Sequence, residues 1–373
     1  MRTDRDGFGT DWAVHYIGRA KMLIERSTST RTNKPAPVDR LALAARDAID
    51  LGGERTSSAL AEPVEAGANH ETVSVRTFFL LEWNMRLHDL LRTISDPAHL
   101  PDSNPQITAV VYNSRAVTPG ALFVAYRGFH TDGHLYIPQA IERGAAAVVY
   151  EDPAWDDRIP VPALRTSNAR VALAPLAAAF YDYPGRRMRV VGVTGTDGKT
   201  TTTFLTSVAL EAGGAVTGLM GTVDFKIAGR MWANNSRQST PEAPEVQALL
   251  RDMVHAGCTY AVVEATSHAL SARWNRLAGC AFDVAVLTNV TQEHLDFHGT
   301  VEQYRRDKAR LFEMLAEFRS ADAPHKQRKI AVVNADDPHH RMFLAAAPLY
   351  AERLTYAVHA DADVRAEDVP FDS

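Results

Sequence analysis

Residues 192–203 read GVTGTDGKTTTT, and they directly follow the run MRVV at 188–191. A buried strand that ends in a glycine-rich loop and continues into a helix is typical of a phosphate-binding loop. Gly195 and Gly198 allow backbone N–H groups to approach phosphate oxygens closely. Lys199 can place its charge on the outer phosphates, and the hydroxyl of Thr200 is placed to bind Mg²⁺. The pattern therefore predicts a nucleoside triphosphate site.

The spacing of this loop differs from the pattern G-x-x-x-x-G-K-[ST], which requires glycine at position 193. This chain has Val193 there, and the nearest glycine is Gly192. The alternative is a glycine turn that merely precedes a helix. Because the G-K-T triplet lies between a strand pattern and a helix pattern, we favour the nucleotide site.

The bulk composition sets limits on function. The chain has 373 residues, of which 46% are hydrophobic and 23% charged, as in a soluble globular protein of two or three domains. A net charge of −5 gives no reason to expect a nucleic-acid partner. No apolar run is long enough for a membrane helix, and the N-terminus lacks a secretory signal, so we expect a cytoplasmic protein without a membrane partner. Cys258 and Cys280 are predicted to be buried thiols.

The chain divides into three predicted segments. Residues 1–84 are rich in Arg, Ser, Thr, Ala and Glu and are expected to form a poorly ordered extension, with Met85 as an alternative start. Residues 85–182 are predicted to form a small α/β domain. Residues 186–373 alternate strand and helix patterns, which predicts an α/β domain with a doubly wound, mostly parallel sheet.

Individual elements follow from the apolar patterns. Strands are predicted at TAVVYNSR (108–115), ALFVAY (121–126), AAAVVYED (145–152), MRVVGVTG (188–195), TYAVVEA (259–265), DVAVLTNV (283–290) and KIAVVNADD (329–337). Helices are predicted at His134–Gly144, Thr200–Ala212, Pro244–Ala256 and Val301–Phe318.

Polar side chains follow three of the strands predicted after the loop, where ligands gather in sheets of this kind. Glu264 ends one strand, Thr288 and Asn289 end the next, and Asn334 and Asp336 end the third. We interpret Glu264 as a Mg²⁺ ligand, because a carboxylate beside a phosphate loop often holds this metal. The alternative is a helix N-cap or a loop carboxylate.

Three of the candidate residues carry little information by themselves. A lone histidine such as His294 is more often structural than functional. Lys308 lies in YRRDKARLF, where a lysine on an amphipathic helix is usually a solvated side chain. Asp336 before Asp337 and Pro338 could equally cap a helix.

Five segments, taken together, resemble the Mur ligases, the ATP-dependent amide-forming enzymes of peptidoglycan synthesis. In chain order they are GVTGTDGKTTT, STPEAPEVQ, VEATSHAL, TNVTQEHLDFHGTVEQYRRDKARLF and VVNADD. The resemblance covers about residues 85–373. It is strongest to the ligases that act on UDP-N-acetylmuramoyl-L-alanyl-D-glutamate. The looser phosphate loop of this family also accounts for Val193.

The resemblance implies a set of nucleotide and metal contacts. The implied ATP contacts are Gly195, Thr196, Asp197, Gly198, Lys199, Thr200 and Thr201, with Asn334 and Asp336 near the adenosine. Thr200 and Glu264 would hold a first Mg²⁺, and His294 would help to hold a second. Lys308 corresponds to a lysine that CO₂ carbamoylates into a metal-binding anion. Carbamoylation requires a neutral amine, so the site must lower the pKa of Lys308. Lys199, His294 and Lys308 are therefore the implied catalytic residues.

The segment YNSRAVTPGALFVAYRGFHTDG at 112–133 resembles the pocket of this family for the UDP-linked substrate. The implied contacts are Tyr112, Ser114, Phe129, His130, Thr131, Gln238, Ser239, Thr240, Thr266 and Arg276. The chain departs from the family at four positions: Asn113 replaces the usual Asp, Thr266 the usual Ser, Gln238 an Asn and Trp274 a glutamine contact. Two extra residues between His268 and Thr288 leave Arg273 as an alternative to Arg276.

The resemblance also implies a reaction. ATP would phosphorylate the D-Glu carboxylate to an acyl phosphate, which the amine of a diamino acid would then attack. The implied partners are small molecules, namely ATP, the UDP-linked dipeptide and the diamino acid, and the chain is expected to be a monomer. Members of the family carry a third, C-terminal domain that binds the amino acid. We expect this chain, which ends at Ser373, to lack it and to turn over poorly.

Three alternative functions remain open at this point. A folylpolyglutamate synthase generally begins near the phosphate loop, so the domain at 85–182 argues against it. SHAL and DFHGT fit the diamino-acid ligases better than the D-Ala-D-Ala-adding ligase. The third alternative is a non-catalytic protein that binds a nucleotide or a UDP-sugar.

Overall fold

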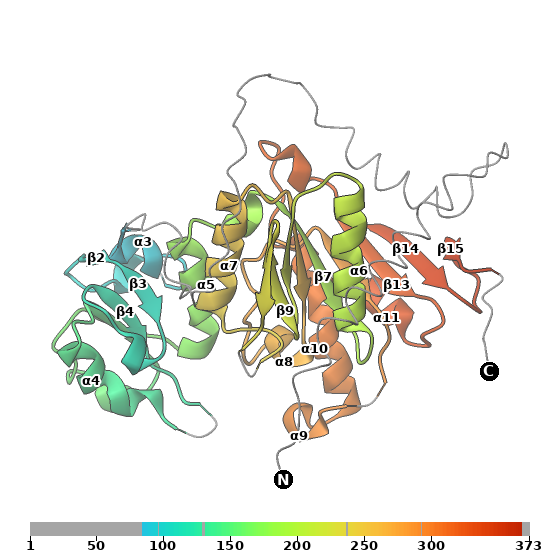
Figure 1. Cartoon of the computed structure of the whole chain (residues 1–373). Helices are drawn as coiled ribbons and strands as arrows, with labels where there is room; N and C mark the ends of the chain where they lie inside the picture. The colour runs from blue at the N-terminus through green and yellow to red at the C-terminus, as the bar shows by residue number, and fades with distance from the viewer. Residues whose placement is uncertain (1–83, 96, 129–130, 236–237, 292, 368–373) are drawn as a thin grey trace, which may run out of the picture. The chain divides into compact units, whose positions relative to one another are not determined.

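The structure is a computed structural model that describes residues 84–95, 97–128, 131–235, 238–291 and 293–367. The predicted extension lies outside these residues except for residue 84, and so do Phe129 and His130. The described residues belong to one compact unit. They form a two-stranded, a four-stranded and a nine-stranded sheet (Figure 1).

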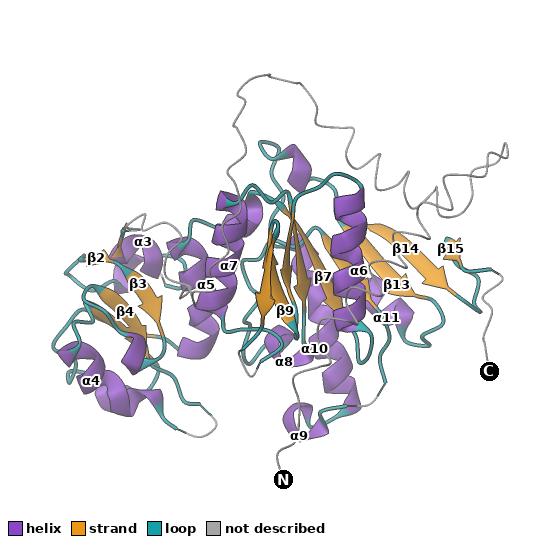
Figure 2. Cartoon of the chain, viewed as in Figure 1, coloured by secondary structure: helices purple, strands orange, loops and turns teal. Residues whose placement is uncertain are grey.

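The four-stranded sheet is parallel and has helices on both faces (Figure 2). Its strands, in sheet order, are β3 (Ala109–Val111), β4 (Ala121–Val124), β5 (Ala147–Tyr150) and β6 (Ala163–Arg165). Leu122 and Val124 pack with α3 (Leu87–Leu91) and α5 (Ala169–Phe180), whereas Phe123 packs with α4 (Ile137–Glu142). Successive side chains of a strand point to opposite faces, so β4 is apolar throughout because both faces are covered. Beside it, β1 (Met85–Arg86) and β2 (Gln106–Ile107) pair antiparallel.

Three elements of this part differ from the sequence prediction. The helix expected at His134–Gly144 begins later, because Asp132 accepts a hydrogen bond from the backbone N–H of His134 and caps a separate 3₁₀ turn before α4. The strand expected at 108–115 ends at Val111, since Asn113 caps a further 3₁₀ turn. Helix α5 was not predicted.

The nine-stranded sheet has the order β10-β9-β8-β11-β7-β12-β13-β14-β15. In chain order its strands are β7 (Arg189–Thr194), β8 (Thr217–Met220), β9 (Asp224–Ile227), β10 (Arg230–Ala233), β11 (Tyr260–Glu264), β12 (Val284–Leu287), β13 (Ile330–Asn334), β14 (Glu352–Ala357) and β15 (Val364–Arg365). In this sheet order, all neighbouring strands from β8 through β11, β7, β12, β13 and β14 to β15 are parallel. At the other edge, β9 runs antiparallel to both β8 and β10. The predicted fold class, an α/β fold with a mostly parallel sheet, is confirmed.

Helices cover both faces of this sheet (Figures 1 and 2). Helix α6 (Lys199–Ala212) packs through Leu210 on the face that carries Val191 and Val193. The opposite face is covered by α7 (Ala243–His255), α8 (Ser267–Leu270), α10 (Val301–Glu313) and α11 (His340–Ala346), and α9 (Leu295–His298) precedes α10. Cys258 and Cys280 are free thiols buried in this core, as predicted.

A buried charge cluster lies where β7, β12 and β13 begin. Asp283 accepts hydrogen bonds from the backbone N–H of Val190 and from Lys329 Nζ, each at 2.8 Å, and also from Lys326 Nζ. Both lysine side chains are fully buried. Burial lowers the pKa of Lys326 to about 8, although Asp283 opposes this shift. One carboxylate thus ties together the starts of three strands.

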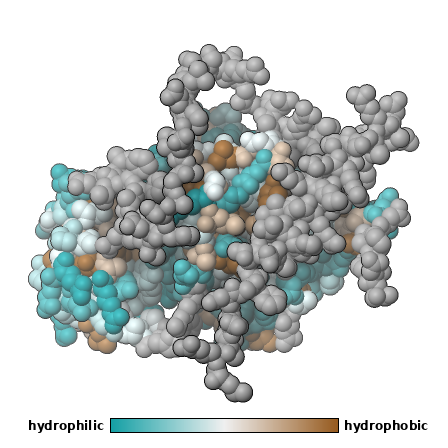
Figure 3. Space-filling view, viewed as in Figure 1, coloured by the Kyte–Doolittle hydropathy of each residue, from teal (hydrophilic) through white to brown (hydrophobic). Residues whose placement is uncertain are grey.

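The surface is mixed in character. Figure 3 shows that the part of this face around the four-stranded sheet is mainly hydrophilic, with hydrophobic side chains scattered singly, as is normal for a folded protein. Of the helices that the structure describes, none has both the length and the apolar character needed to cross a membrane.

Candidate active site

The candidate site lies at the carboxyl ends of β11, β7 and β12, which are neighbours at the centre of the large sheet. In the strand registers, Glu264 of β11 lies beside Val193 of β7, and Leu287 of β12 lies beside Thr194 of β7. The phosphate-loop sequence, Glu264 and the Thr288-Asn289 pair therefore leave the sheet at the same edge. This is where open parallel sheets bind their ligands.

The glycine-rich loop is held by the segment that follows β12. Gly195 has a φ of +154°, and a Cβ atom there would lie 1.8 Å from Thr288 Oγ1, so no larger residue fits. Thr288 Oγ1 donates to the carbonyl of Asp197 at 2.6 Å, and the backbone N–H of Thr196 donates to the carbonyl of Asn289 at 2.8 Å. The close approach to Thr288 explains why the loop needs glycine at position 195.

The loop passes directly into helix α6. Gly198, with a φ of +77°, precedes the helix, and Lys199 is its first residue. Lys199 Nζ donates to the carbonyl of Thr196 at 2.6 Å. Thr201, the last of the predicted ATP contacts in the loop, is exposed on the first turn of α6. The lysine and the helix N-terminus form a positively polarised end that suits phosphate.

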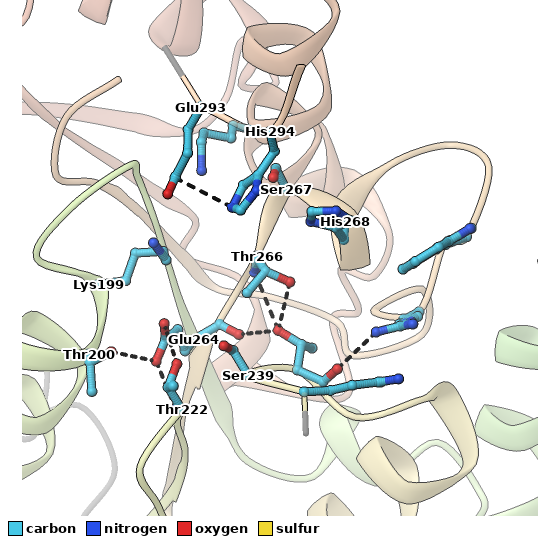
Figure 4. A pocket seen from close by; sticks show the side chains of 15 residues that line it. Lys199, Thr200, Thr222, Ser239, Glu264, Thr266, Ser267, His268, Glu293 and His294 are labelled. Atoms are coloured by element: carbon cyan, nitrogen blue, oxygen red, sulfur yellow. Dashed lines mark hydrogen bonds and ion pairs between the residues drawn. The ribbon is translucent and has the colours of Figure 1, made fainter. Parts of the chain in front are cut away.

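Glu264 lies beside the start of α6 (Figure 4). Its Oε2 accepts from Thr200 Oγ1 at 3.0 Å and from the backbone N–H of Thr222 at 3.0 Å, and its Oε1 accepts from Thr222 Oγ1 at 2.9 Å. These contacts fix the buried carboxylate close to the hydroxyl of Thr200. Thr222, which the sequence did not indicate, follows β8 and supports Glu264 from the other side.

Lys308 is not a solvated surface lysine. It lies on the inner face of α10 with only 1% of its surface exposed, and its Nζ donates to the carbonyl of Gly195 at 2.6 Å. The same Nζ lies 4.6 Å from the ring centre of Tyr304. Burial, together with the nearby charge of Lys199, lowers the pKa of Lys308 to about 7. The amine therefore loses its proton near neutral pH.

Most of the predicted substrate and metal residues meet in one cavity of about 450 Å³. Among the predicted residues, the cavity is lined by Lys199, Thr200, Gln238, Ser239, Thr240, Glu264, Thr266, Arg276, His294 and Lys308. Thr222, Ser267, His268, Trp274 and Glu293 also line it. Figure 4 shows the labelled side chains around this space, with Lys199 and Glu264 close to each other. His268 and Glu293 lie inside the segments that carry the family resemblance, but their sequence pattern predicted no role for them.

Three histidines gather near one side of the cavity. His294 has left-handed backbone angles, with a φ of 55°, and its Nε2 lies 3.5 Å from Glu293 Oε2. The ring of His268 lies 4.9 Å from that of His294 and 5.4 Å from that of His298, measured between centroids. Burial and the neighbouring His294 lower the pKa of His268 to about 4, so this ring is neutral near pH 7.

The predicted substrate residues after β10 are tied to the end of β11. Thr240 Oγ1 donates to the carbonyl of Glu264 at 2.9 Å and lies 3.1 Å from Thr266 Oγ1. Arg276 donates to the carbonyl of Thr240 at 3.0 Å and to Glu242 at 2.6 Å. Arg276 therefore lines the larger cavity with two of its nitrogens already engaged. Arg273, its alternative, lines a second cavity.

The remaining predicted contacts lie elsewhere. Tyr112 donates to Glu245 at 3.0 Å, Ser114 lies 2.7 Å from Gln139 Oε1, and Thr131 lies 3.2 Å from the hydroxyl of Tyr136. The second cavity, of about 260 Å³, is lined by Arg127, Gly128, Glu151, Asn168, Arg170, Arg273 and Trp274. Trp274 lines both cavities.

Asn334 and Asp336 lie after β13 and are engaged in local contacts. Asn334 Nδ2 donates to the carbonyl of Thr288 at 3.0 Å. Asp336 accepts from the backbone N–H groups of residues 358–360, which hold its pKa below the usual range. Neither residue lines the larger cavity. Their predicted place near an adenosine stays a prediction.

The donor set fits a triphosphate with Mg²⁺ better than it fits a metal held by protein alone. Within the described ranges, no three His, Cys, Asp or Glu side chains come together to hold a metal ion. Mg²⁺ commonly takes one or two carboxylates and completes its shell with water and phosphate oxygens. Glu264 and the Thr200 hydroxyl at the start of α6 provide such a partial shell.

The fold and this site define a known class of protein. The model of the Mur ligase middle domain matches residues 193–373, and that of the Mur ligase family, catalytic domain, matches residues 106–181. The chain belongs to the Mur ligase family.

Among curated proteins, a UDP-N-acetylmuramyl-tripeptide synthetase from Roseiflexus sp. (strain RS-1) is 85% identical over 285 residues, covering 76% of this chain and 56% of the relative. A protein of the same name from Deinococcus radiodurans is 43% identical over 290 residues, covering 76% of this chain and 55% of the relative. The chain thus spans about half the length of the curated relatives that it matches.

Solved structures agree with this assignment. A UDP-N-acetylmuramoyl-L-alanyl-D-glutamate–2,6-diaminopimelate ligase structure matches with a TM-score of 0.60 and 26% identity, over 76% of this chain and 54% of that one. MurF from Acinetobacter baumannii shares the fold, with a TM-score of 0.53 at 19% identity, over 77% of this chain and 56% of that one.

Proposed function

We propose that this chain carries the ATP site and the UDP-substrate site of a ligase that adds a diamino acid to UDP-N-acetylmuramoyl-L-alanyl-D-glutamate. The observation that carries the proposal is the convergence of Lys199, Glu264 and Lys308 in one cavity at the end of three adjacent strands. The 85% identity to a tripeptide synthetase supports the same substrate class.

Each of these residues would have a distinct role. Lys199 would neutralise charge on the phosphates during transfer to the D-Glu carboxylate. Thr200, Glu264, His294 and Lys308 are the proposed metal residues, and Mg²⁺ would supply electrostatic stabilisation of the transferred group. The Gly195 carbonyl holds the Lys308 amine in a buried position. We propose that CO₂ carbamoylates this amine, because a neutral amine is the reactive form.

The proposed substrate path uses the residues around the larger cavity. Ser239, Thr240, Thr266 and Arg276 would contact the muramoyl-dipeptide portion. Tyr112, Ser114 and Thr131 would contact the uridine diphosphate. The proposed partners are small molecules only. Because the reaction consumes ATP, we infer a cytoplasmic protein, and we propose that it is a monomer. Light scattering during size-exclusion chromatography tests the monomer.

Calorimetry and isotope exchange test the function on the 373-residue chain. We expect saturable binding of an ATP analogue with Mg²⁺ and of UDP-N-acetylmuramoyl-L-alanyl-D-glutamate. We also expect positional isotope exchange in ¹⁸O-labelled ATP that depends on the dipeptide substrate, since reversible carboxylate phosphorylation scrambles the bridging oxygen. Binding without exchange would instead support the non-catalytic alternative. Exchange that requires a UDP-tripeptide would support the D-Ala-D-Ala-adding ligase.

A further inference from the structure

A buried chain of three polar side chains ends at the wall of the larger cavity. His298, the last residue of α9, has its Nδ1 2.6 Å from Asp307 Oδ2 and its Nε2 3.0 Å from Ser267 Oγ. The His298 side chain is 0% exposed, and Ser267 is 2% exposed. Ser267 lines the cavity that also contains Lys199 and Glu264, and Figure 4 shows it close to His294 and His268. The chain of contacts therefore runs from the protein interior to the site.

The direction of each hydrogen bond follows from what each group can donate. Gln303 Nε2 donates to Asp307 Oδ1 at 3.0 Å, so both oxygens of Asp307 act as acceptors. The Nδ1 of His298 must then carry the proton and donate it to Asp307, which leaves a lone pair on Nε2. Ser267 can only donate its hydroxyl proton to Nε2. The serine oxygen keeps its lone pairs for a donor in the cavity.

The surroundings favour the neutral ring that this arrangement needs. The rings of His268, Phe297 and Tyr304 pack around His298 with centroids 4.7 to 5.4 Å away. In Ser-His-Asp arrangements of this kind the histidine takes the serine proton, which activates the serine oxygen, and the aspartate stabilises the resulting imidazolium.

We propose that Ser267, backed by His298 and Asp307, accepts the proton that the incoming amine loses during amide formation. This inference rests on the ligase function proposed above. The amine nitrogen attacks the acyl carbon, the new C–N bond forms, and the C–O bond to phosphate breaks, so that phosphate leaves. One proton moves from the nitrogen to Ser267 Oγ while the serine proton moves to His298 Nε2. The imidazolium is stabilised by Asp307 and returns its proton through Ser267 to the departing phosphate.

The alternative is that the same bonds only fix α8 against α10. Both roles predict a loss when the chain of contacts is broken, but they differ in which step is lost. Carboxylate phosphorylation involves no amine, so a proton acceptor for the amine is not needed there. A purely structural tie would disturb both steps, because α8 and α10 carry residues that face the whole cavity.

The test measures the two steps separately in the 373-residue chain. Substrate-dependent positional isotope exchange in ATP reports carboxylate phosphorylation. Phosphate release that depends on added hydroxylamine reports attack by an amine small enough to require no amino-acid pocket. For Ser267→Ala we expect isotope exchange to change by no more than a few fold and amine-dependent phosphate release to fall about 10²-fold.

Further variants separate proton transfer from packing. His298→Asn keeps a donor toward Asp307 but removes the base, so it should match Ser267→Ala, and the double variant should be no worse than either single variant. Ser271→Ala is the matched control, since this buried serine at the opposite end of α8 donates its hydroxyl to the carbonyl of His268 at 3.0 Å and not to a group of the proposed relay. It should leave both readouts unchanged.

Two results would overturn the proposal: equal losses in both readouts for Ser267→Ala, or no loss in either. If the unsubstituted chain shows no substrate-dependent isotope exchange, the ligase function itself fails and this inference fails with it. Thermal unfolding of each variant confirms that the chain is folded during the measurement.

Discussion

Carbamoylation of Lys308 should occur near neutral pH, and its dependence on pH can be worked from the structure. An ordinary lysine, with a pKa of 10.5, holds about 0.03% of its amine in the neutral form at pH 7. With a pKa of about 7, Lys308 holds roughly half of it in that form. Burial thus increases the reactive fraction more than about a thousandfold. At fixed dissolved CO₂, we expect the carbamate to increase with pH across neutrality, because its formation from the protonated amine releases protons.

Carbon-13 NMR with labelled bicarbonate measures the carbamate directly. Lys308→Arg should abolish the protein-bound carbamate signal, because arginine cannot be carbamoylated. Lys226→Arg is a matched control, since Lys226 lies on β9 in an ion pair with Glu211. No carbamate on the unsubstituted chain at pH 8, or an equal loss in the control, would refute the reasoning.

The same lowered pKa predicts how folding stability depends on pH in the absence of CO₂. The unfolded chain binds a proton at Lys308 over the range from about pH 7 to 10.5, where the folded chain does not. The free energy of unfolding should therefore rise with pH across this window. Below pH 7 Lys308 is protonated in both the folded and the unfolded chain, so it no longer contributes to the pH dependence. Lys308→Met should flatten the dependence in denaturant titrations. An unchanged slope would show that Lys308 titrates normally.

Three further predictions concern the loop, the buried charges and the metal. Gly195→Ala should weaken binding of an ATP analogue at least about tenfold by calorimetry, since the Cβ of the alanine would lie 1.8 Å from Thr288 Oγ1. Equal affinity would show that the loop binds the nucleotide without this close approach. Asp283→Ala should lower the free energy of unfolding by about 3–5 kcal/mol, because it leaves Lys326 and a second lysine buried without their carboxylate, and adding Lys326→Met should restore part of the loss. Glu264→Gln should raise the Mg²⁺ concentration needed for ATP-dependent thermal stabilisation by about 10–100-fold, with stabilisation by the UDP-substrate as the internal control.

The strands with continuous apolar runs were predictable because both faces of the sheet are covered. Patterns at 188–195, 259–265, 283–290 and 329–337 each contain a strand of the large sheet. The pair β9 and β10 was missed, since its residues are mostly half-buried or exposed at the sheet edge and carry no apolar run. Helix α5 was missed because its alanine-rich sequence, which contains Pro175, shows no clear apolar stripe.

Local sequence indicated single residues of the candidate site better than it indicated the side chains around them. Glu264 could be assigned from its place at the end of a strand beside the loop. Lys308 could not, because a lysine within a charged helix gives no sign that α10 turns it toward Gly195. Thr222 and the contact between Ser267 and His298 depend on segments that are distant in sequence, so only the fold brings them together.

The position of β7 in the sheet has a consequence for amide hydrogen exchange. Strands β11, β7 and β12 each have a partner on both sides, whereas β10 and β15 form the edges. Local opening generally begins at edges, which have fewer neighbours to lose. The outer strands can therefore exchange their amide protons while the three central strands stay closed. A ligand bound at the loop raises the free energy of global unfolding, and we expect it to slow exchange in the three central strands only by this route. At residues 195–201 the bound ligand should slow exchange directly.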